Sequence, residues 1–281
     1  MTQQSFLTGL IGAPIAHSAS PAMHRRAADC LNVRCHYQLI EVAGAGHEEL
    51  RSLLEGVRRL GFVGVNVTYP YKEEVVDLLD ELSSSAAAIG AVNTVLVREG
   101  RLIGHNTDAT GFTRAAAHLV SGSGSESVAV IGAGGVGKAI AVALAGLGVS
   151  EIRIYDTDQG KADKLASLLG SRGVVAYDLG AALQGAVGIV NATPVGMFPS
   201  LDTPIPEFLL HDRLWVADAV YFPLWTPLLT AAKARGARIT TGRDLAIYQA
   251  AEAFHLFTGL VPSVIEMGVA FDQAMAKAPG R

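Results

Sequence analysis

The chain has 281 residues, of which 50% are hydrophobic and 17% charged, and its formal net charge is −4. This composition predicts a sizeable buried core, in two domains or one large one, and excludes a disordered chain. It offers no basic surface for nucleic acid, no apolar run long enough to span a membrane and no secretory leader, so we expect a soluble, cytoplasmic protein.

The first part of the chain, residues 6–104, alternates strand-like apolar runs with helical patterns. Such alternation predicts an α/β fold with a mainly parallel sheet. This part has no glycine fingerprint, so we interpret it as a substrate domain. We predict strands at 6–11, 37–42 and 63–68, helices at 21–31, 47–60 and 71–82, and a hairpin of 92–98 and 101–104 around Glu99 and Gly100.

The two cysteines and eight histidines provide no metal or disulfide signal. Cys30 falls on a predicted helix and Cys35 at the start of the next strand, so we expect reduced, partly buried thiols. The histidines show no metal-ligand spacing, and we predict no metal.

A polar cluster, His17-Ser-Ala-Ser-Pro21, separates the first strand from the first helix. Ser20 is a natural N-cap with Pro21 at the first helical position. Hydroxyl groups of Ser18 and Ser20 beside a helix N-terminus would also suit a bound carboxylate. Spacing alone favours the cap.

A second cluster follows the strand at 63–68. Asn66 and Thr68 alternate to one face at a strand's carboxyl end, where α/β proteins bind ligands. Lys72 would lie in the first turn of the next helix, where the macrodipole disfavours a cation. It is either a solvated surface lysine or an amine that the helix end keeps neutral and ready for proton transfer.

A third cluster contains Asp108, directly before a predicted helix at 108–120. Asp108 is a helix cap or a functional carboxylate, and Asn93 is a turn residue or a polar group in an apolar setting. A polar linker at 121–127 leads from this helix into the next domain.

That domain begins with strand, glycine turn, helix and strand over residues 127–158. Gly132, Gly134 and Gly137 form G-x-G-x-x-G, which in isolation is often a flexible loop. Here the glycines suit a tight turn, close approach of backbone to a pyrophosphate, and helix packing on a strand. The context therefore predicts a dinucleotide site.

The ends of this unit supply the other expected contacts. The diphosphate would bind free N–H groups of the helix that begins near Gly135 and Val136. Asp156 and Asp158 follow the glycines by about 20 residues, where a carboxylate accepts hydrogen bonds from the ribose of NAD.

Further strands and two apolar helices complete the chain, and we expect the two helices to pack on the first domain. The strands are predicted near 174–177, 188–192, 215–220 and 238–240, and the helices at 244–257 and 262–275. The overall prediction is an α/β protein with a substrate-binding catalytic domain (1–107 with 244–281) and a Rossmann-type, doubly wound dinucleotide-binding domain (108–243).

Together these motifs resemble the shikimate and quinate dehydrogenases over nearly the whole chain. The matching segments, in family order, are GLIGAPIAHSASPAMH, GVNVTYPYK, IGAVNTV, GHNTDATGF, VIGAGGVGKAI, NATPVGM, ADAVYFPLWTPLL and QAAEAFHLFTG. The most specific are H-S-x-S-P, N-V-T-x-P-x-K and N-T-D-x-x-G.

The resemblance implies roles for particular residues. Lys72 and Asp108 match the catalytic pair that flanks the oxidised hydroxyl, takes its proton and steadies the developing charge. Residues matching substrate contacts are Ser18 and Ser20 for the carboxylate, Asn66, Thr68, Asn93 and Gln249 for ring hydroxyls, and Tyr221 in the same cleft. Residues matching cofactor contacts, besides the glycine turn, are Thr193, Met197, Val220 and Gly242.

The acidic run Asp156-Thr157-Asp158 bears on the choice of cofactor. NADP-using members usually carry Asn-Arg-Thr or Asn-Arg-Ser there, and the arginine clamps the 2′-phosphate. Two carboxylates would repel that phosphate, so we predict NAD over NADP, although Lys161 is near enough in sequence to soften the repulsion.

Several alternatives stay open. The residues do not separate shikimate from quinate, or a monomer from a homodimer. A non-catalytic dinucleotide or shikimate sensor is the other functional class, and retention of Lys72 and Asp108 favours the enzyme. Arg25 and Leu245 replace the asparagine and methionine of many relatives.

Overall fold

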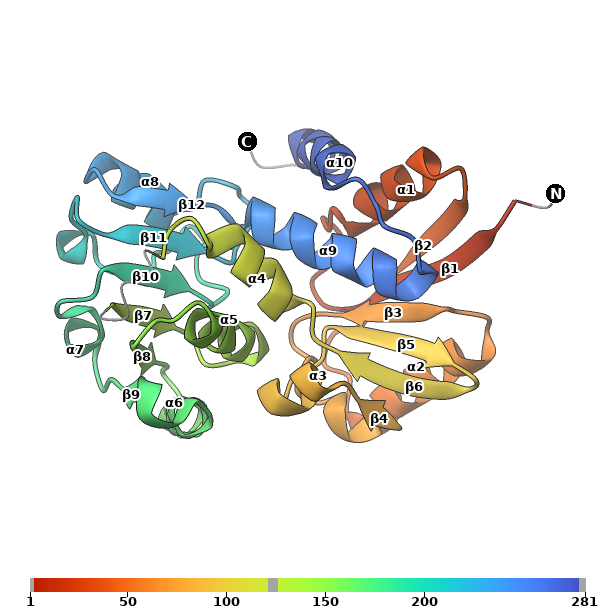
Figure 1. Cartoon of the computed structure of the whole chain (residues 1–281), viewed down its shortest axis with the longest axis horizontal. Helices are drawn as coiled ribbons and strands as arrows, with labels where there is room; N and C mark the ends of the chain where they lie inside the picture. The colour runs from red at the N-terminus through yellow and green to blue at the C-terminus, as the bar shows by residue number, and fades with distance from the viewer. Residues whose placement is uncertain (1–2, 121–125, 278–281) are drawn as a thin grey trace. The chain divides into compact units, whose positions relative to one another are not determined.

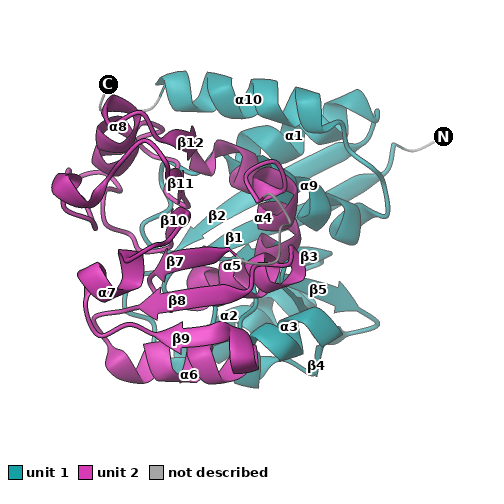
Figure 2. Cartoon of the chain, turned by 60° about the vertical axis from the view of Figure 1, so that its left-hand side comes forward, with its two compact units in different colours: residues 1–107, 247–279 teal, residues 108–246, 280–281 magenta. Residues whose placement is uncertain are grey.

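The computed structural model describes residues 3–120 and 126–277. The chain forms two compact units, which Figure 2 colours separately. Of the described residues, unit 1 comprises 3–107 and 247–277, and unit 2 comprises 108–120 and 126–246. Most of the predicted linker, residues 121–125, lies outside the described residues.

The described part of unit 1 contains a six-stranded sheet in the order β2-β1-β3-β5-β6-β4. β1 is parallel to β2 and β3, and β4 is parallel to β6, whereas β5 runs antiparallel to its two neighbours. The strands are β1 (Ser5–Gly12), β2 (Arg34–Glu41), β3 (Gly64–Val67), β4 (Glu81–Leu82), β5 (Thr94–Arg98) and β6 (Arg101–His105).

Helices cover this sheet, and the last part of the chain contributes to it. α2 buries Leu50, Leu54 and Val57, the periodic apolar positions of its sequence. Phe257 packs on Gly64, where an added Cβ would lie 2.6 Å from its ring. The helices are α1 (Ser20–Cys30), α2 (His47–Arg59), α3 (Ser84–Ile89), α10 (Val264–Lys277) and, from residue 247 onward, α9 (Gly242–Thr258).

The hairpin of β5 and β6 is confirmed. Glu99 and Gly100 both have positive φ, 52° and 75°, as a two-residue turn between antiparallel strands requires. The turn chemistry lies entirely within the local sequence, so the sequence was sufficient to predict it.

The predicted helix at 71–82 is wrong. The segment forms turns, a short 3-10 helix, η1 (Val76–Leu78), and strand β4. Its apolar residues are nevertheless buried, with Tyr71 1%, Val75 0% and Leu78 8% exposed. The i, i+4, i+7 spacing reflected burial, and partners elsewhere in unit 1 replaced the helical hydrogen bonds: Val92 N donates to Lys72 O at 2.8 Å and Asp80 N to Leu102 O at 3.0 Å.

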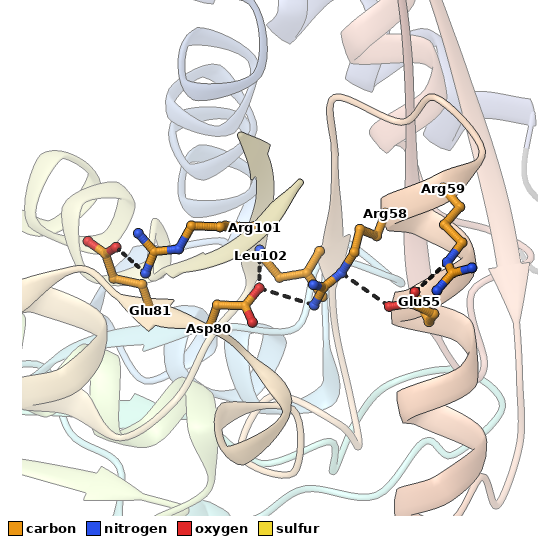
Figure 3. Close-up of polar contacts among 7 residues, drawn as sticks. All are labelled: Glu55, Arg58, Arg59, Asp80, Glu81, Arg101 and Leu102. Carbon is orange, nitrogen blue, oxygen red and sulfur yellow. Dashed lines mark hydrogen bonds and ion pairs between the residues drawn. The ribbon is translucent and has the colours of Figure 1, made fainter. Parts of the chain in front are cut away.

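An ion-pair network holds α2 against the β4 and β6 edge (Figure 3). Asp80 Oδ2 accepts from Leu102 N at 2.7 Å and from Arg58 Nη2 at 3.1 Å. Arg58 Nε lies 3.2 Å from Glu55 Oε2. These groups are partly exposed, so the network contributes orientation more than stability.

Unit 2 contains a parallel six-stranded sheet in its described part, stacked in Figure 1 as β12-β11-β10-β7-β8-β9. In chain order this is the 3-2-1-4-5-6 arrangement of the doubly wound dinucleotide fold, with its switch point between β7 and β10. The predicted Rossmann-type fold class is confirmed. The strands are β7 (Ser127–Ile131), β8 (Glu151–Tyr155), β9 (Gly173–Val175), β10 (Gly188–Asn191), β11 (Trp215–Asp218) and β12 (Arg238–Thr240).

Both faces of the unit 2 sheet are buried. Val128 and Val130 of β7 belong to one apolar cluster, and the alternating Ala129 and Ile131 belong to the cluster on the opposite face. The helices are α4 (Asp108–Ala116), α5 (Gly135–Gly146), α6 (Gln159–Leu169), α7 (Leu179–Leu183), α8 (Pro227–Ala234) and the start of α9.

Two absences hold for residues 3–120 and 126–277. These residues include no helix with the length and apolarity needed to cross a membrane. They also contain no group of three or more His, Cys, Asp or Glu side chains that could hold a metal ion.

Candidate functional site

The serine cluster in unit 1 differs from the predicted cap. α1 begins at Ser20, its N-cap residue is Ala19, and the cap makes no side-chain hydrogen bond. Ser18 Oγ accepts from Ser20 N at 3.2 Å. No bond from Ser20 Oγ to another described residue occurs, so the Ser20 hydroxyl, half-buried at the start of α1, has its hydrogen-bonding capacity left for a ligand.

Asn66 and Thr68 lie at the carboxyl end of β3 and differ in how they are bonded. Both polar atoms of the Asn66 side chain have partners: Oδ1 accepts from Tyr37 Oη at 2.9 Å, and Nδ2 donates to Asn93 O at 3.1 Å and to Thr94 Oγ1 at 2.9 Å. Both amide protons are therefore used internally. Thr68 Oγ1 makes no hydrogen bond within the described chain, so of the two predicted contacts Thr68 has the more available polar group.

Asn93 is buried at a bend directly before β5. Its Oδ1 accepts from Thr107 N at 2.8 Å and from Thr94 Oγ1 at 3.0 Å, and its Nδ2 donates to Thr107 Oγ1 at 2.9 Å. Asn93 thus joins β5 to the segment after β6, which is more than a turn residue does.

Lys72 is neither on the surface nor in a helix. It is 9% exposed, which contradicts the surface-lysine interpretation. The helix-dipole argument also fails, because the chain around Lys72 forms turns. Neighbouring groups hold the segment: Tyr71 Oη donates to Val42 O at 2.8 Å and accepts from Ala45 N at 2.9 Å.

The remaining residues of the predicted substrate set divide between the units. Asp108 is the first residue of α4, is 5% exposed and belongs to unit 2, whereas Lys72 belongs to unit 1. Gln249 lies on the unit 1 part of α9, and Tyr221 follows β11 in unit 2; both are half-buried.

In unit 2 the three glycines of the turn meet different constraints. Gly132 has φ +104°, and an added Cβ would lie 2.9 Å from Thr193 Cγ2. A Cβ on Gly137 would lie 2.0 Å from Gly132 O, so this glycine permits the close packing of α5 on the turn. A Cβ on Gly134 would meet no atom within 4 Å, so the fold leaves open space where the backbone is expected to approach a pyrophosphate. Gly135 and Val136 begin α5.

The two aspartates after β8 have different partners. Asp156 Oδ2 accepts from Ala133 N in the glycine turn at 2.7 Å, and Oδ1 accepts from Asp158 N at 2.8 Å. Asp158 is exposed and caps α6, with Oδ1 accepting from Lys161 N at 3.3 Å. Asp156 therefore holds the turn, and Asp158 is the more exposed of the two carboxylates.

A buried polar pair, Asn191 and Asp218, ends β10 and β11, and sequence reasoning missed it. Asn191 Nδ2 donates to Asp218 Oδ1 at 2.9 Å. Burial raises the pKa of Asp218 to about 6 against the opposing effect of its hydrogen bonds. A polar residue at the end of an apolar run was the available signal, and it occurs in both NATPVGM and ADAVYF.

The pair holds two of the predicted cofactor residues, Thr193 and Val220. Thr193 Oγ1 donates to Asn191 Oδ1 at 2.7 Å and accepts from Val195 N at 3.1 Å, so its hydroxyl is engaged internally. Val220 is buried, and a Cβ on Gly242 would lie 2.5 Å from Val220 O. Met197 is half-buried.

Two family models match this chain. The model described as "Shikimate dehydrogenase substrate binding domain" matches residues 10–95. The model described as "ThiF family" matches residues 122–165, which include the glycine turn.

Curated relatives match almost the whole chain. A shikimate dehydrogenase (NADP(+)) of Streptomyces avermitilis is 44% identical over 276 residues, which cover 95% of this chain and 95% of that protein. A quinate/shikimate dehydrogenase (NAD(+)) of Corynebacterium efficiens is 41% identical over 281 residues, which cover 96% of this chain and 99% of that protein.

Solved structures agree with these matches. Quinate dehydrogenase from Corynebacterium glutamicum in complex with NAD has a TM-score of 0.86 and 39% identity, covering 96% of this chain and 100% of that one. Shikimate 5-dehydrogenase from Thermus thermophilus in complex with NADP(H) and shikimate has a TM-score of 0.85 and 39% identity, covering 96% of this chain and 99% of that one.

Proposed function

Because this chain belongs to the shikimate and quinate dehydrogenase family, whose members are NAD(P)-dependent oxidoreductases acting on a CH–OH group, we propose that it interconverts shikimate and 3-dehydroshikimate. We further propose that it accepts quinate and that it prefers NAD. The comparisons give no support to a non-catalytic sensor.

The burial of Lys72 is the observation that carries the catalytic part of the proposal. Lysine is among the residue types least often buried, because removing an ammonium group from water is costly. Lys72 is 9% exposed. It follows β3, at whose carboxyl end Asn66 and Thr68 lie. Since neither a surface role nor a helix end explains it, we assign Lys72 to proton transfer at the ring hydroxyl.

Oxidation of a carbinol requires that a hydride and a proton both leave. Bound nicotinamide supplies the hydride acceptor. Lys72 and Asp108 would hold the hydroxyl, receive its proton and stabilise charge on the oxygen, and in the reverse direction they would return the proton. Ser18, Ser20 and Thr68 would orient the acid, since they have hydroxyl groups with hydrogen-bonding capacity left in unit 1.

The NAD preference is supported by the chain after β8. A 2′-phosphate placed there would face the exposed carboxylate of Asp158, which would repel it, whereas ribose hydroxyls would donate to the same group. Asp158 is exposed whereas Asp156 is half-buried and bonded to the glycine turn, so we assign the discrimination to Asp158. The named relatives include both NAD(+) and NADP(+) enzymes, so the preference needs its own measurement.

The decisive experiment follows reduced nicotinamide with shikimate, with quinate and without acid, in the presence of NAD or NADP. We expect turnover with NAD and shikimate, and a fall of about 10²–10⁴-fold in kcat for Lys72→Met. Lys164→Met, at an exposed position on α6, is the matched control. Unchanged turnover in Lys72→Met would remove Lys72 from the mechanism, and binding of dinucleotide without any turnover would favour the sensor.

The same assay tests the finer proposals. Comparable kcat/KM values for NADP and NAD would contradict the NAD preference, and absence of quinate oxidation would restrict the substrate to shikimate. Asp158→Asn is expected to raise the kcat/KM ratio of NADP to NAD, whereas Asp163→Asn, an exposed carboxylate on the same helix, is expected to leave it unchanged.

A further inference from the structure

The most buried carboxylate in the described part of unit 2 is Asp218, the last residue of β11. It is 3% exposed, and three hydrogen bonds converge on it from different segments. Asn191 Nδ2 and Val220 N donate to Oδ1, each at 2.9 Å, and Thr226 Oγ1 donates to Oδ2 at 2.7 Å. Burying a carboxylate is costly, and the three donors offset only part of that cost, since the pKa of Asp218 stays raised.

One set of contacts leads from Asp218 to the glycine turn. Asn191 and Asp218 are register partners on β10 and β11, so their side chains meet. An ionised carboxylate can only accept, and this forces Asn191 to present Nδ2 to Asp218 and Oδ1 to Thr193. Thr193 Oγ1 then donates to Asn191 Oδ1 at 2.7 Å. A Cβ added to Gly132 would lie 2.9 Å from the methyl carbon of Thr193, so Thr193 packs against the glycine turn.

A second set of contacts leads to the segment after β11. Val220 N is bonded to Asp218, and Val220 O lies against Gly242 at the start of α9, where a Cβ would come within 2.5 Å. Thr226, the third donor, also caps α8 by accepting from Leu229 N at 3.2 Å. One carboxylate thus fixes the backbone after β10, the backbone after β11 and the start of α8.

We propose that Asp218 is a positioning residue for dinucleotide binding, which acts through Asn191 and Val220 and does not itself touch the ligand. The inference rests on the proposed function, because it requires that unit 2 binds a nicotinamide dinucleotide. The segments it holds border the switch point between β7 and β10, where doubly wound sheets bind their ligands. Burial raises the pKa of Asp218 to about 6, and the hydrogen bonds that its oxygens accept oppose this rise.

The test measures NADH and shikimate affinities separately in the full chain at pH 8, by fluorescence and calorimetric titration. Asp218→Asn keeps the shape but lets the group donate, so Asn191 and Val220 lose a charged acceptor. We expect the Kd for NADH to rise about tenfold while the Kd for shikimate stays within about twofold. Asp212→Asn, an exposed carboxylate before the same strand, is expected to change neither.

A second variant keeps the test decisive if Asp218→Asn does not fold. Thr226→Val removes the hydroxyl that donates to Asp218 Oδ2 and leaves the carboxylate in place, and it is expected to weaken NADH binding in the same direction. The inference would be overturned if the variants bound NADH as tightly as the wild type does, or if the Kd values for NADH and shikimate rose equally. A wild-type chain that binds NADH but oxidises neither acid would refute the proposed function and leave this inference standing.

Discussion

The two units build their candidate half-sites from different parts of the chain. In unit 1 the candidate groups are mostly side chains. The buried amide of Asn66 donates to Asn93 O and Thr94 Oγ1, and that of Asn93 donates to Thr107 Oγ1. In unit 2 the candidate groups are mostly backbone, shaped by glycines and by the loops that Asp218 holds. We therefore expect unit 1 to be sensitive to the loss of a polar group and unit 2 to the addition of a carbon atom.

The units also differ in the buried group that titrates. His24 of unit 1 is fully buried beside Tyr37, with ring centroids 4.5 Å apart, and neither of its nitrogens has a hydrogen-bond partner within residues 3–120 and 126–277. Burial lowers the pKa of His24 to about 3, whereas burial raises the pKa of Asp218 to about 6. The two groups therefore couple stability to pH with opposite signs.

The largest expected effect is acid destabilisation through His24. The unfolded chain binds a proton at this residue below its ordinary pKa of 6.5, and the folded chain does so only below about 3. Stability is therefore lost as the pH falls from 6.5 to 3, by up to about 5 kcal/mol. Urea unfolding of wild type and His24→Leu across this range measures it, and equal pH slopes in the two proteins would contradict the prediction.

Asp218 is expected to act in the other direction by a smaller amount. The folded chain keeps a proton on the Asp218 carboxyl group up to about pH 6, whereas the unfolded chain loses it near pH 3.8. Stability therefore falls as the pH rises from 3.8 to 6, by about 3 kcal/mol, and partly offsets the histidine effect. Asp218→Asn should steepen the acid loss of stability in the same urea series. A shallower slope in this variant would show the sign to be wrong.

An added methyl group should separate the two roles of glycine in unit 2. Gly137→Ala places a Cβ 2.0 Å from Gly132 O and should lower the free energy of unfolding by about 1–3 kcal/mol along with NADH affinity. Gly134→Ala meets no protein atom within 4 Å, so it should weaken NADH binding without lowering the melting temperature. Calorimetry and NADH titration distinguish the variants. A destabilised Gly134→Ala would show that this glycine serves the fold instead.

The smallest effect is expected for a hydroxyl group in unit 1. Thr107→Val removes the partner of Asn93 Nδ2 and should cost about 1 kcal/mol of stability. It should also raise the Kd for shikimate while leaving the Kd for NADH unchanged, which is the reverse of the Gly134→Ala result. Ser127→Ala, at the partly exposed start of β7, is the control for hydroxyl loss. Equal weakening of both ligands by Thr107→Val would remove the contrast between the units.

Two differences from the sequence-based predictions involve partners that are distant in the chain, whereas the error at the Ser20 cap is local. The helix predicted at 71–82 was lost to hydrogen bonds with residues 92 and 102, and the Ser20 cap was displaced when α1 began at Ser20 itself. Asn191 and Asp218 were overlooked because their bond joins residues 27 positions apart. Which residues contact substrate or cofactor stays a prediction.

The sequence by itself determined the alternation of strands and helices, the glycine turn after β7 and the hairpin at Glu99 and Gly100. Each of these depends on side-chain periodicity or on backbone torsions within a few residues. Only the tertiary structure decided that Lys72 is buried without a helix, that the amide protons of Asn66 are used internally, and that Asp218 organises two loops. Burial and hydrogen-bond partners at these positions come from segments brought together by folding, and no local pattern encodes them.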